Sequence, residues 1–282
     1  MINIYNFENL NSFNSFSTIE LIIISSFLLA LGSFSSSLIF RLSPSFHKFK
    51  KNILFSRSFC PTCKSNLSPL ELIPMLSYLF QFAKCRSCKS KIPIHYFLGE
   101  SLFLIVGLWV LFTYGKTIFS LIIITIFFIF LILLVLGYKY FYLPFSLNIS
   151  LIFIGFSSNY FYFAFVDNNY LLVFGTPLMF SLYGFIFGYT SLWLINFIYK
   201  NFSNKDGIGG GDFILFAGLG SLFGPFSLSI ILLFASIIGF ALYFLQKGNS
   251  NKQIPLGSCL IISSFLYIFI KKNELLKNIL VI

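Results

Sequence analysis

The chain has 282 residues, of which 57% are hydrophobic and only 10% charged, and its formal net charge is +11. A soluble domain of this length needs a larger charged surface, so the composition excludes an ordinary soluble protein. The positive charge could indicate nucleic-acid binding, but ten of the nineteen Lys and Arg residues lie between Arg41 and Lys91. Such clustering is typical of a cytoplasmic loop, and we expect no nucleic-acid partner.

Long apolar runs predict about eight transmembrane helices, because each crossing needs about 20 apolar residues. The runs are 18–40, 94–114, 117–136, 146–165, a long run that follows Asp167 and reaches Tyr199, then 212–223, 226–245 and 255–270. The sixth run is short enough to be tilted or re-entrant. We therefore expect an all-α integral membrane protein surrounded by membrane lipid.

The basic residues also predict the orientation of these helices. No Lys or Arg precedes the first run, and Arg41 follows it, which sends the N-terminus outward and the next loop inward. The same count places on the cytoplasmic side Lys139, Lys200, Lys205, Lys247 and Lys252. Three lysines are exceptions, because the same count places them on the outer side: Lys271, Lys272 and Lys277.

The basic loop carries four cysteines as two CxxC pairs, namely Cys60, Cys63, Cys85 and Cys88. Two such pairs can close a tetrahedral thiolate site around Zn²⁺. Disulfides would require the loop to lie outside, against the positive charge. Because four thiolates fill the coordination shell, we expect a structural zinc in a ribbon-like loop domain. The predicted domains are 1–40 with the first helix, 41–93 with the four cysteines, and 94–282 as the transmembrane core.

Only eight acidic residues are available for chemistry. Asp212 opens an apolar helix after three glycines, where an aspartate is either a helix cap or a functional carboxylate. We expect Glu100 to cap a helix and Asp167 to lie in a turn. Neither histidine has a partner at metal-ligand spacing, and Cys259 is expected to fill an apolar helix face.

Several motifs follow one another in a recognisable order. They are Leu31-Gly-Ser-Phe34, Ser56-Arg-Ser-Phe-Cys-Pro-Thr-Cys63, Ile73-Pro-Met-Leu-Ser77, Cys85-Arg-Ser-Cys88, Tyr96 with Glu100, Gly209-Gly-Gly-Asp212-Phe213 and Ile254-Pro-Leu-Gly257. In this order they resemble the prepilin peptidases, membrane aspartic proteases of type IV pilus and type II secretion systems. The resemblance covers about residues 29–260.

The resemblance implies an enzyme of the bacterial cytoplasmic (inner) membrane with the cysteine loop on the cytoplasmic side. Such enzymes cleave leader peptides from type IV prepilin or pseudopilin precursors. Many of them then methylate the new N-terminus with S-adenosylmethionine. Cleavage uses two aspartates, one as general base and the other as acid, since neighbouring carboxyl groups separate their pKa values.

One of these two aspartates is missing from the sequence. Asp212 matches the second, whereas the first is expected seven residues before Pro144, where this chain has Gly137. Ile214 also replaces a common lysine of the family motif, and Asp206 is the only nearby substitute acid. Three functions follow: a working peptidase and methyltransferase, a degenerate member that binds prepilin or secretion components without cleaving, or an unrelated zinc-ribbon membrane channel or scaffold.

Overall fold

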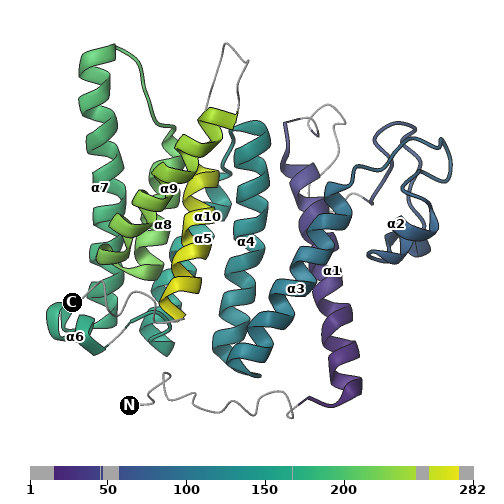
Figure 1. Cartoon of the computed structure of the whole chain (residues 1–282), viewed down its shortest axis with the longest axis horizontal. Coiled ribbons are helices and arrows are strands. Elements are labelled where there is room, and N and C mark those ends of the chain that lie inside the picture. Colours follow the sequence, from purple (N-terminus) through teal and green to yellow (C-terminus); the bar gives the residue numbers. More distant parts are fainter. Residues whose placement is uncertain (1–15, 45, 47–56, 167, 246–253, 273–282) are drawn as a thin grey trace. The chain divides into compact units, whose positions relative to one another are not determined.

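The computed structural model describes residues 16–44, 46, 57–166, 168–245 and 254–272 (Figure 1). In these residues the regular structure is helical, with two isolated β-bridges, Phe59–Asn66 and Lys84–Lys91. The helices are α1 (Thr18–Leu42), the 3₁₀ turn η3 (Pro69–Leu72), α2 (Leu76–Phe80), α3 (His95–Tyr114), α4 (Ile118–Tyr140), α5 (Phe145–Tyr162), α6 (Asn168–Phe174), α7 (Pro177–Ser203), α8 (Gly210–Phe223), α9 (Pro225–Leu245) and α10 (Leu256–Lys272).

The all-helical class is confirmed, but the count of eight membrane spans is not. Five of the described helices are long and apolar enough to cross a membrane: α1, α3, α4, α7 and α9. At 1.5 Å per residue, α8 with 14 residues is about 21 Å long, short of a hydrocarbon core of about 30 Å. With 17 residues α10 is also short, and the Asn and Ser residues inside α5 make it less apolar.

The long run expected after Asp167 is divided into two helices. Gly175 has φ +74°, a left-handed conformation that suits glycine, and it separates α6 from α7. Thr176 then caps α7, because its side chain accepts a hydrogen bond from the Met179 N–H. Asp167 itself lies outside the described residues, and so does His47, one of the two histidines of the chain.

The chain divides into two compact units, Met1–Ile132 and Leu133–Ile282. In the first unit, α1 packs along α3. A Cβ atom at Gly32 of α1 would lie 2.9 Å from the Glu100 Cα and 3.0 Å from the Phe103 Cβ. Glycine therefore permits the close approach of these two helices, as small residues do between membrane helices.

Glu100 does not cap α3, contrary to the sequence expectation. It lies in the second turn of α3 and is 7% exposed, and its Oε2 accepts a hydrogen bond from the Met75 N–H at 2.7 Å. The Ser33 hydroxyl of α1 also bonds to this carboxylate. A single buried side chain thus connects α1, α3 and the segment that separates the two cysteine pairs.

In the second unit, α8 contacts α5, α7, α9 and α10 (Figure 1). Every residue of α8 from Leu215 to Phe223 is buried. The α7–α8 contact is direct between backbones, because a Cβ atom at Gly184 would collide with the Gly220 carbonyl, and one at Gly188 would lie 2.6 Å from the Phe216 carbonyl oxygen. The short α8 is therefore enclosed by other helices of its unit, which explains how so short an apolar helix is stabilised.

Asn159 of α5 connects three helices at the C-terminal end of α8. Its Nδ2 donates to the Ser181 hydroxyl and to the carbonyl oxygens of Ser221 and Leu222, and its Oδ1 accepts from the Phe165 N–H. Its donors and its acceptor are all used, as expected of a buried amide.

Candidate active site and metal centre

Asp212 lies at the third position of α8, after the N-cap residue Gly209. Its carboxylate accepts hydrogen bonds from the backbone N–H groups of Gly209 and Gly257. The first contact resembles half of a capping box, in which the third helical residue reaches back to the N-cap backbone. The second contact comes from the start of α10. The cap and the functional interpretations of Asp212 are therefore compatible, since one carboxylate makes both contacts.

Gly137 lies near the end of α4, beside Ser258, which follows Gly257 at the start of α10. A Cβ atom at position 137 would lie 2.8 Å from the Ser258 Oγ and 3.3 Å from the Leu143 Cδ2. The Ser258 hydroxyl donates to the Leu134 carbonyl oxygen at 3.0 Å, and Ser258 is 1% exposed. Ser258 therefore occupies the space into which a side chain at position 137 would extend.

Leu143 connects the positions that the sequence motifs single out. Besides its contact at Gly137, it would touch a Cβ atom at Gly211 at 3.0 Å and one at Gly257 at 2.7 Å. A Cβ atom at Gly257 would also lie 2.8 Å from the Asp212 Oδ1. The end of α4, the α4–α5 connection, the start of α8 and the start of α10 thus meet around Asp212.

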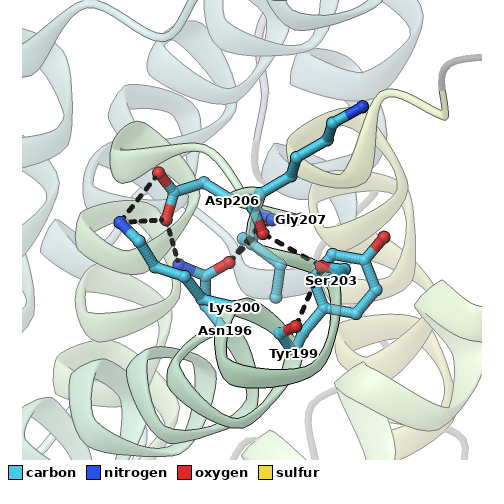
Figure 2. Close-up of polar contacts among 8 residues, drawn as sticks. Asn196, Tyr199, Lys200, Ser203, Asp206 and Gly207 are labelled. Carbon is cyan, nitrogen blue, oxygen red and sulfur yellow. Dashed lines mark hydrogen bonds and ion pairs between the residues drawn. The ribbon is translucent and has the colours of Figure 1, made fainter.

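Asp206 takes part in a different set of contacts (Figure 2). Its carboxylate lies 3.1 Å from the Lys200 Nζ and accepts a hydrogen bond from the Asn196 Nδ2 at 3.2 Å. Lys200, and then Asn196, hold the pKa of Asp206 below its ordinary value. A carboxyl group held in its ionised form is poorly suited to act as the acid partner of Asp212.

Asn196 holds the glycine loop that leads to Asp212. Its Oδ1 accepts hydrogen bonds from the N–H groups of Gly207 and Ile208 at 2.9 and 3.1 Å, while its Nδ2 binds Asp206 (Figure 2). Asn196 is 8% exposed and lies on α7. The side chain therefore fixes the backbone two and three residues before the first residue of α8.

The four loop cysteines come together in the first unit. The Sγ atoms of Cys60, Cys63, Cys85 and Cys88 all lie within 4.8 Å of one another, and none of these cysteines forms a disulfide. Two similar turns carry them: the Cys60 N–H donates to the Ser65 carbonyl, and the Cys85 N–H donates to the Ser90 carbonyl. The cluster is compatible with a metal site.

The spacing of one sulfur pair matches that of a tetrahedral zinc site. With Zn–S bonds of about 2.3 Å, a tetrahedral set has sulfur–sulfur distances of about 3.8 Å. The Sγ atoms of Cys60 and Cys88 lie 3.8 Å apart. Burial opposes ionisation of Cys60, but the N–H groups of Cys63 and Thr62 outweigh it and lower the pKa of this thiol to about 6. Cys60 thus favours the thiolate form that binds metal. At Cys85 the N–H groups of Cys88 and Ser87 are outweighed by burial and by the thiols of Cys60 and Cys88, which raise the pKa of this thiol.

Two family models match consecutive parts of the chain. Residues 26–114 match the bacterial peptidase A24 N-terminal domain, and residues 124–244 match the type IV leader peptidase family. A protein of Vibrio cholerae serotype O1, named prepilin leader peptidase/N-methyltransferase, is 31% identical over 256 residues. That alignment covers 89% of this chain and 97% of the relative. The chain belongs to the type IV leader peptidase family.

Two further relatives with the same name show similar agreement. The Legionella pneumophila protein is 30% identical over 270 residues, covering 88% of this chain and 90% of the relative. The Neisseria gonorrhoeae protein is 31% identical over 217 residues, covering 76% and 71%. No solved structure gives a significant match. The cysteine loop lies within the region matched to the A24 N-terminal domain, and Gly137 and Asp212 lie within the region matched to the type IV leader peptidase family.

Three residues near the leader peptidase motifs were missed by the sequence reasoning. They are Asn148 on α5, Asn196 on α7 and Ser258 on α10. The two asparagines stand in mainly apolar helices, and a polar side chain in such a position is a usable signal of function or of helix–helix bonding. Ser258 gave no signal of its own, because its importance lies only in its contact with Gly137.

Proposed function

We propose that this chain processes type IV prepilin or pseudopilin precursors at the cytoplasmic face of a bacterial inner membrane. The observation that carries the proposal is the meeting of Gly137, Leu143, Gly257 and Asp212 in one unit, in a chain of the leader peptidase family. Three segments distant in sequence, namely 137–143, the start of α8 and the start of α10, meet there around a single carboxylate. This is the arrangement that an aspartic protease site requires, with one of its two carboxylates absent.

Asp212 is the residue that we assign to the activation of water. The Gly209 and Gly257 N–H groups orient its carboxylate, and an oriented carboxylate can take a proton from a water that attacks the scissile carbonyl carbon. At Gly137 there is no second carboxyl group to donate a proton to the carbonyl oxygen or to the leaving amine. Because a well-placed general acid or base contributes about 10²–10⁴-fold, cleavage by this chain should be slow.

The test is cleavage of a purified prepilin by the full-length chain, compared with Asp212→Ala and Gly137→Asp variants. We expect slow cleavage by the unmodified chain, none by Asp212→Ala, and a rate about 10²–10⁴-fold higher for Gly137→Asp. Cleavage that persists in Asp212→Ala would refute the assignment of Asp212.

Ser258 favours a second candidate function, a member that binds prepilin without cleaving it. The Ser258 hydroxyl fills the space beside Gly137 and is held by the Leu134 carbonyl oxygen. An aspartate at position 137 must rotate this hydroxyl away, so a Gly137→Asp, Ser258→Ala double variant should cleave faster than Gly137→Asp alone. Absence of cleavage in the unmodified chain, together with retained prepilin binding, would support this second function.

The relatives' shared name also supports a proposal of methyl transfer to the new N-terminus. S-adenosylmethionine, when bound, would supply the methyl group from its sulfonium to the amine. Zn²⁺ is our proposal for the metal held by Cys60, Cys63, Cys85 and Cys88, which fill its shell and give it a structural role. Methylation of a pre-cleaved pilin, measured separately from cleavage, tests the transfer step.

A further inference from the structure

An exposed apolar surface lies on the segment between the two cysteine pairs. Five of its large side chains are between 50% and 84% exposed, and we call them the α2 surface: Leu70, Leu76, Leu79, Phe80 and Phe82. Leu76, Leu79 and Phe80 are three and four residues apart, so they share one face of α2. The other two residues line, with Leu76 and Phe80, a groove of about 800 Å³. A patch of this kind marks an interaction surface.

Two contacts hold α2 beside the first turns of α3. The rings of Tyr78 and Phe97 lie 5.4 Å apart between centroids, and the Met75 N–H at the start of α2 donates to the Glu100 Oε2. Figure 1 shows α2 level with the N-terminal part of α3. With 20 residues α3 is about 30 Å long, which is about the thickness of the hydrocarbon core. Its first turns, and the α2 surface beside them, therefore lie at the depth of the lipid headgroups.

Basic side chains border the same groove. Lys84, Arg86 and Lys89 line it together with the apolar residues, and all three are exposed. Glu71 is the one acid among the lining residues, and its Oε2 already accepts hydrogen bonds from the N–H and the hydroxyl of Ser68. The groove therefore has an excess of positive charge beside an apolar wall. An anionic phospholipid offers the complement, because its negative headgroup lies directly above apolar chains.

The turn after α2 exposes a large ring at a conformational cost. Phe82 and Ala83 have φ values of 50° and 56°, a left-handed conformation that is uncommon for residues with a Cβ atom. Such a conformation costs free energy that surrounding contacts must offset. Phe82 is 84% exposed, so packing within the chain offsets little of it. Contact of this ring with lipid would supply the missing burial.

We propose that the α2 surface docks on the bilayer leaflet at the N-terminal end of α3, which is the cytoplasmic leaflet in the proposed orientation. Its apolar side chains enter the upper part of the acyl chains, while Lys84, Arg86 and Lys89 contact anionic headgroups. The inference uses the orientation of the loop but not the peptidase activity. A soluble acidic partner would pair with the cations but would leave the apolar side chains in the membrane interface uncovered.

The test places a single indole on the α2 surface of the full-length chain. Trp109→Phe and Trp193→Phe remove the two natural tryptophans, and Phe80→Trp adds a reporter at a position that is 78% exposed. The chain is placed in nanodiscs of phosphatidylcholine brominated near the acyl carbonyl, with or without phosphatidylglycerol. Bromine quenches an indole only at close contact, so we expect strong quenching with phosphatidylglycerol and weak quenching without it.

Charge variants measure the contribution of the cations. Each of Lys84→Gln, Arg86→Gln and Lys89→Gln should lower the ratio of docked to free α2 surface by about fivefold, the equivalent of about 1 kcal/mol per cation at an anionic leaflet. The matched control neutralises three exposed cations of the same loop that do not line the groove: Arg57→Gln, Lys64→Gln and Lys91→Gln. This triple control removes the same charge as the groove triple variant and should keep most of the quenching.

Apolar variants and a folding check complete the test. Leu76→Ser and Leu79→Ser should each reduce the quenching. Protection of the Met75 amide from hydrogen exchange shows that the loop remains folded, since Glu100 accepts its hydrogen bond. Equal quenching with and without phosphatidylglycerol, equal effects of the two triple variants, or an unquenched indole in a folded loop would each overturn the proposal. Because no prepilin is present, the result is independent of whether the chain cleaves.

Discussion

The contacts that hold the Asp212 carboxylate leave almost no space for a side chain at Gly257. The Gly257 N–H bonds to this carboxylate, and the same residue has Leu143 on its other side. A methyl group at position 257 would lie 2.8 Å from the Asp212 Oδ1 and 2.7 Å from the Leu143 Cδ1. Both distances are too short, so the carboxylate or the start of α10 would have to move.

Gly257→Ala should therefore lower the cleavage rate, by about 10²-fold if the carboxylate is displaced by about 1 Å. Prepilin cleavage by the purified variant measures this, with thermal unfolding as a check on the fold. Gly239→Ala on α9 is the matched control, because its methyl group would meet the Ile254 Cγ2 at 3.3 Å and the Cys259 Sγ at 3.8 Å but no atom of Asp212 within 4 Å. Equal activity of both variants would contradict the geometry described around Gly257.

At the scale of the elements, the loop between α7 and α8 depends on Asn196. Replacing Asn196 with leucine leaves the N–H groups of Gly207 and Ile208 without their acceptor and removes one donor from Asp206. We expect exchange of these two amide hydrogens to accelerate by about tenfold or more, the equivalent of one lost hydrogen bond. Cleavage should fall with it, because the loop leads directly into α8. Amide hydrogen exchange and the prepilin assay measure the two effects.

Lys200→Met is the matched control for Asn196→Leu. It removes the ion pair to Asp206 but leaves the Asn196 Oδ1 contacts in place. The side chains of this pair are 56% and 60% exposed, and exposed ion pairs contribute little. If Lys200→Met accelerated exchange as much as Asn196→Leu, the loop would depend on the ion pair and not on the amide.

Another element-scale prediction concerns Glu100, which fixes the segment between the cysteine pairs to α3. Glu100→Ala removes the acceptor of the Met75 N–H and should destabilise this segment by about 1–3 kcal/mol. Glu100→Gln keeps an oxygen at this place and should preserve most of the contact. Hydrogen exchange across 73–80 and limited proteolysis of the loop compare the two. Equal protection in both variants would show that the Met75 contact is not needed.

At the scale of the whole molecule, the cysteine cluster and the helices around Asp212 belong to separate compact units. Removing the metal should therefore release the loop and leave the second unit folded. We expect a Cys60→Ser, Cys85→Ser variant to lose its zinc and its protease resistance in the loop, while Cys259→Ala keeps both. Metal analysis and limited proteolysis measure this. Unchanged zinc content in the double variant would refute the site.

Much of the helical layout follows from the sequence, because apolar runs of about 20 residues have few alternatives to a helix. The contacts that each helix makes do not follow from the sequence. The break at Gly175 is one glycine among many, and the enclosure of α8 depends on Gly184 and Gly188, which lie on another helix. Whether a short apolar helix crosses the membrane alone or is enclosed by its neighbours is a property of tertiary packing.

The candidate sites also combine features that the sequence predicts with features that only the folded chain shows. The spacing of the cysteines predicts their cluster, because two CxxC turns present sulfurs to one point. The glycines before Asp212 indicate a special helix start. The meeting of Gly137 with Ser258, and the unpaired oxygen of Asn148, require the folded chain, since both depend on residues that are distant in sequence.

The backbone contact between Gly184 and Gly220 has a consequence for how the gene can change. Every codon change that replaces glycine adds a Cβ atom, and at either position that atom would collide with the backbone of the opposite helix. Neither glycine can therefore be replaced by a neutral substitution while α8 keeps its place. Asp212 lies two turns before Gly220 in α8. Its position therefore depends on Gly184 and Gly220, whose role is to leave room for the backbone of the opposite helix.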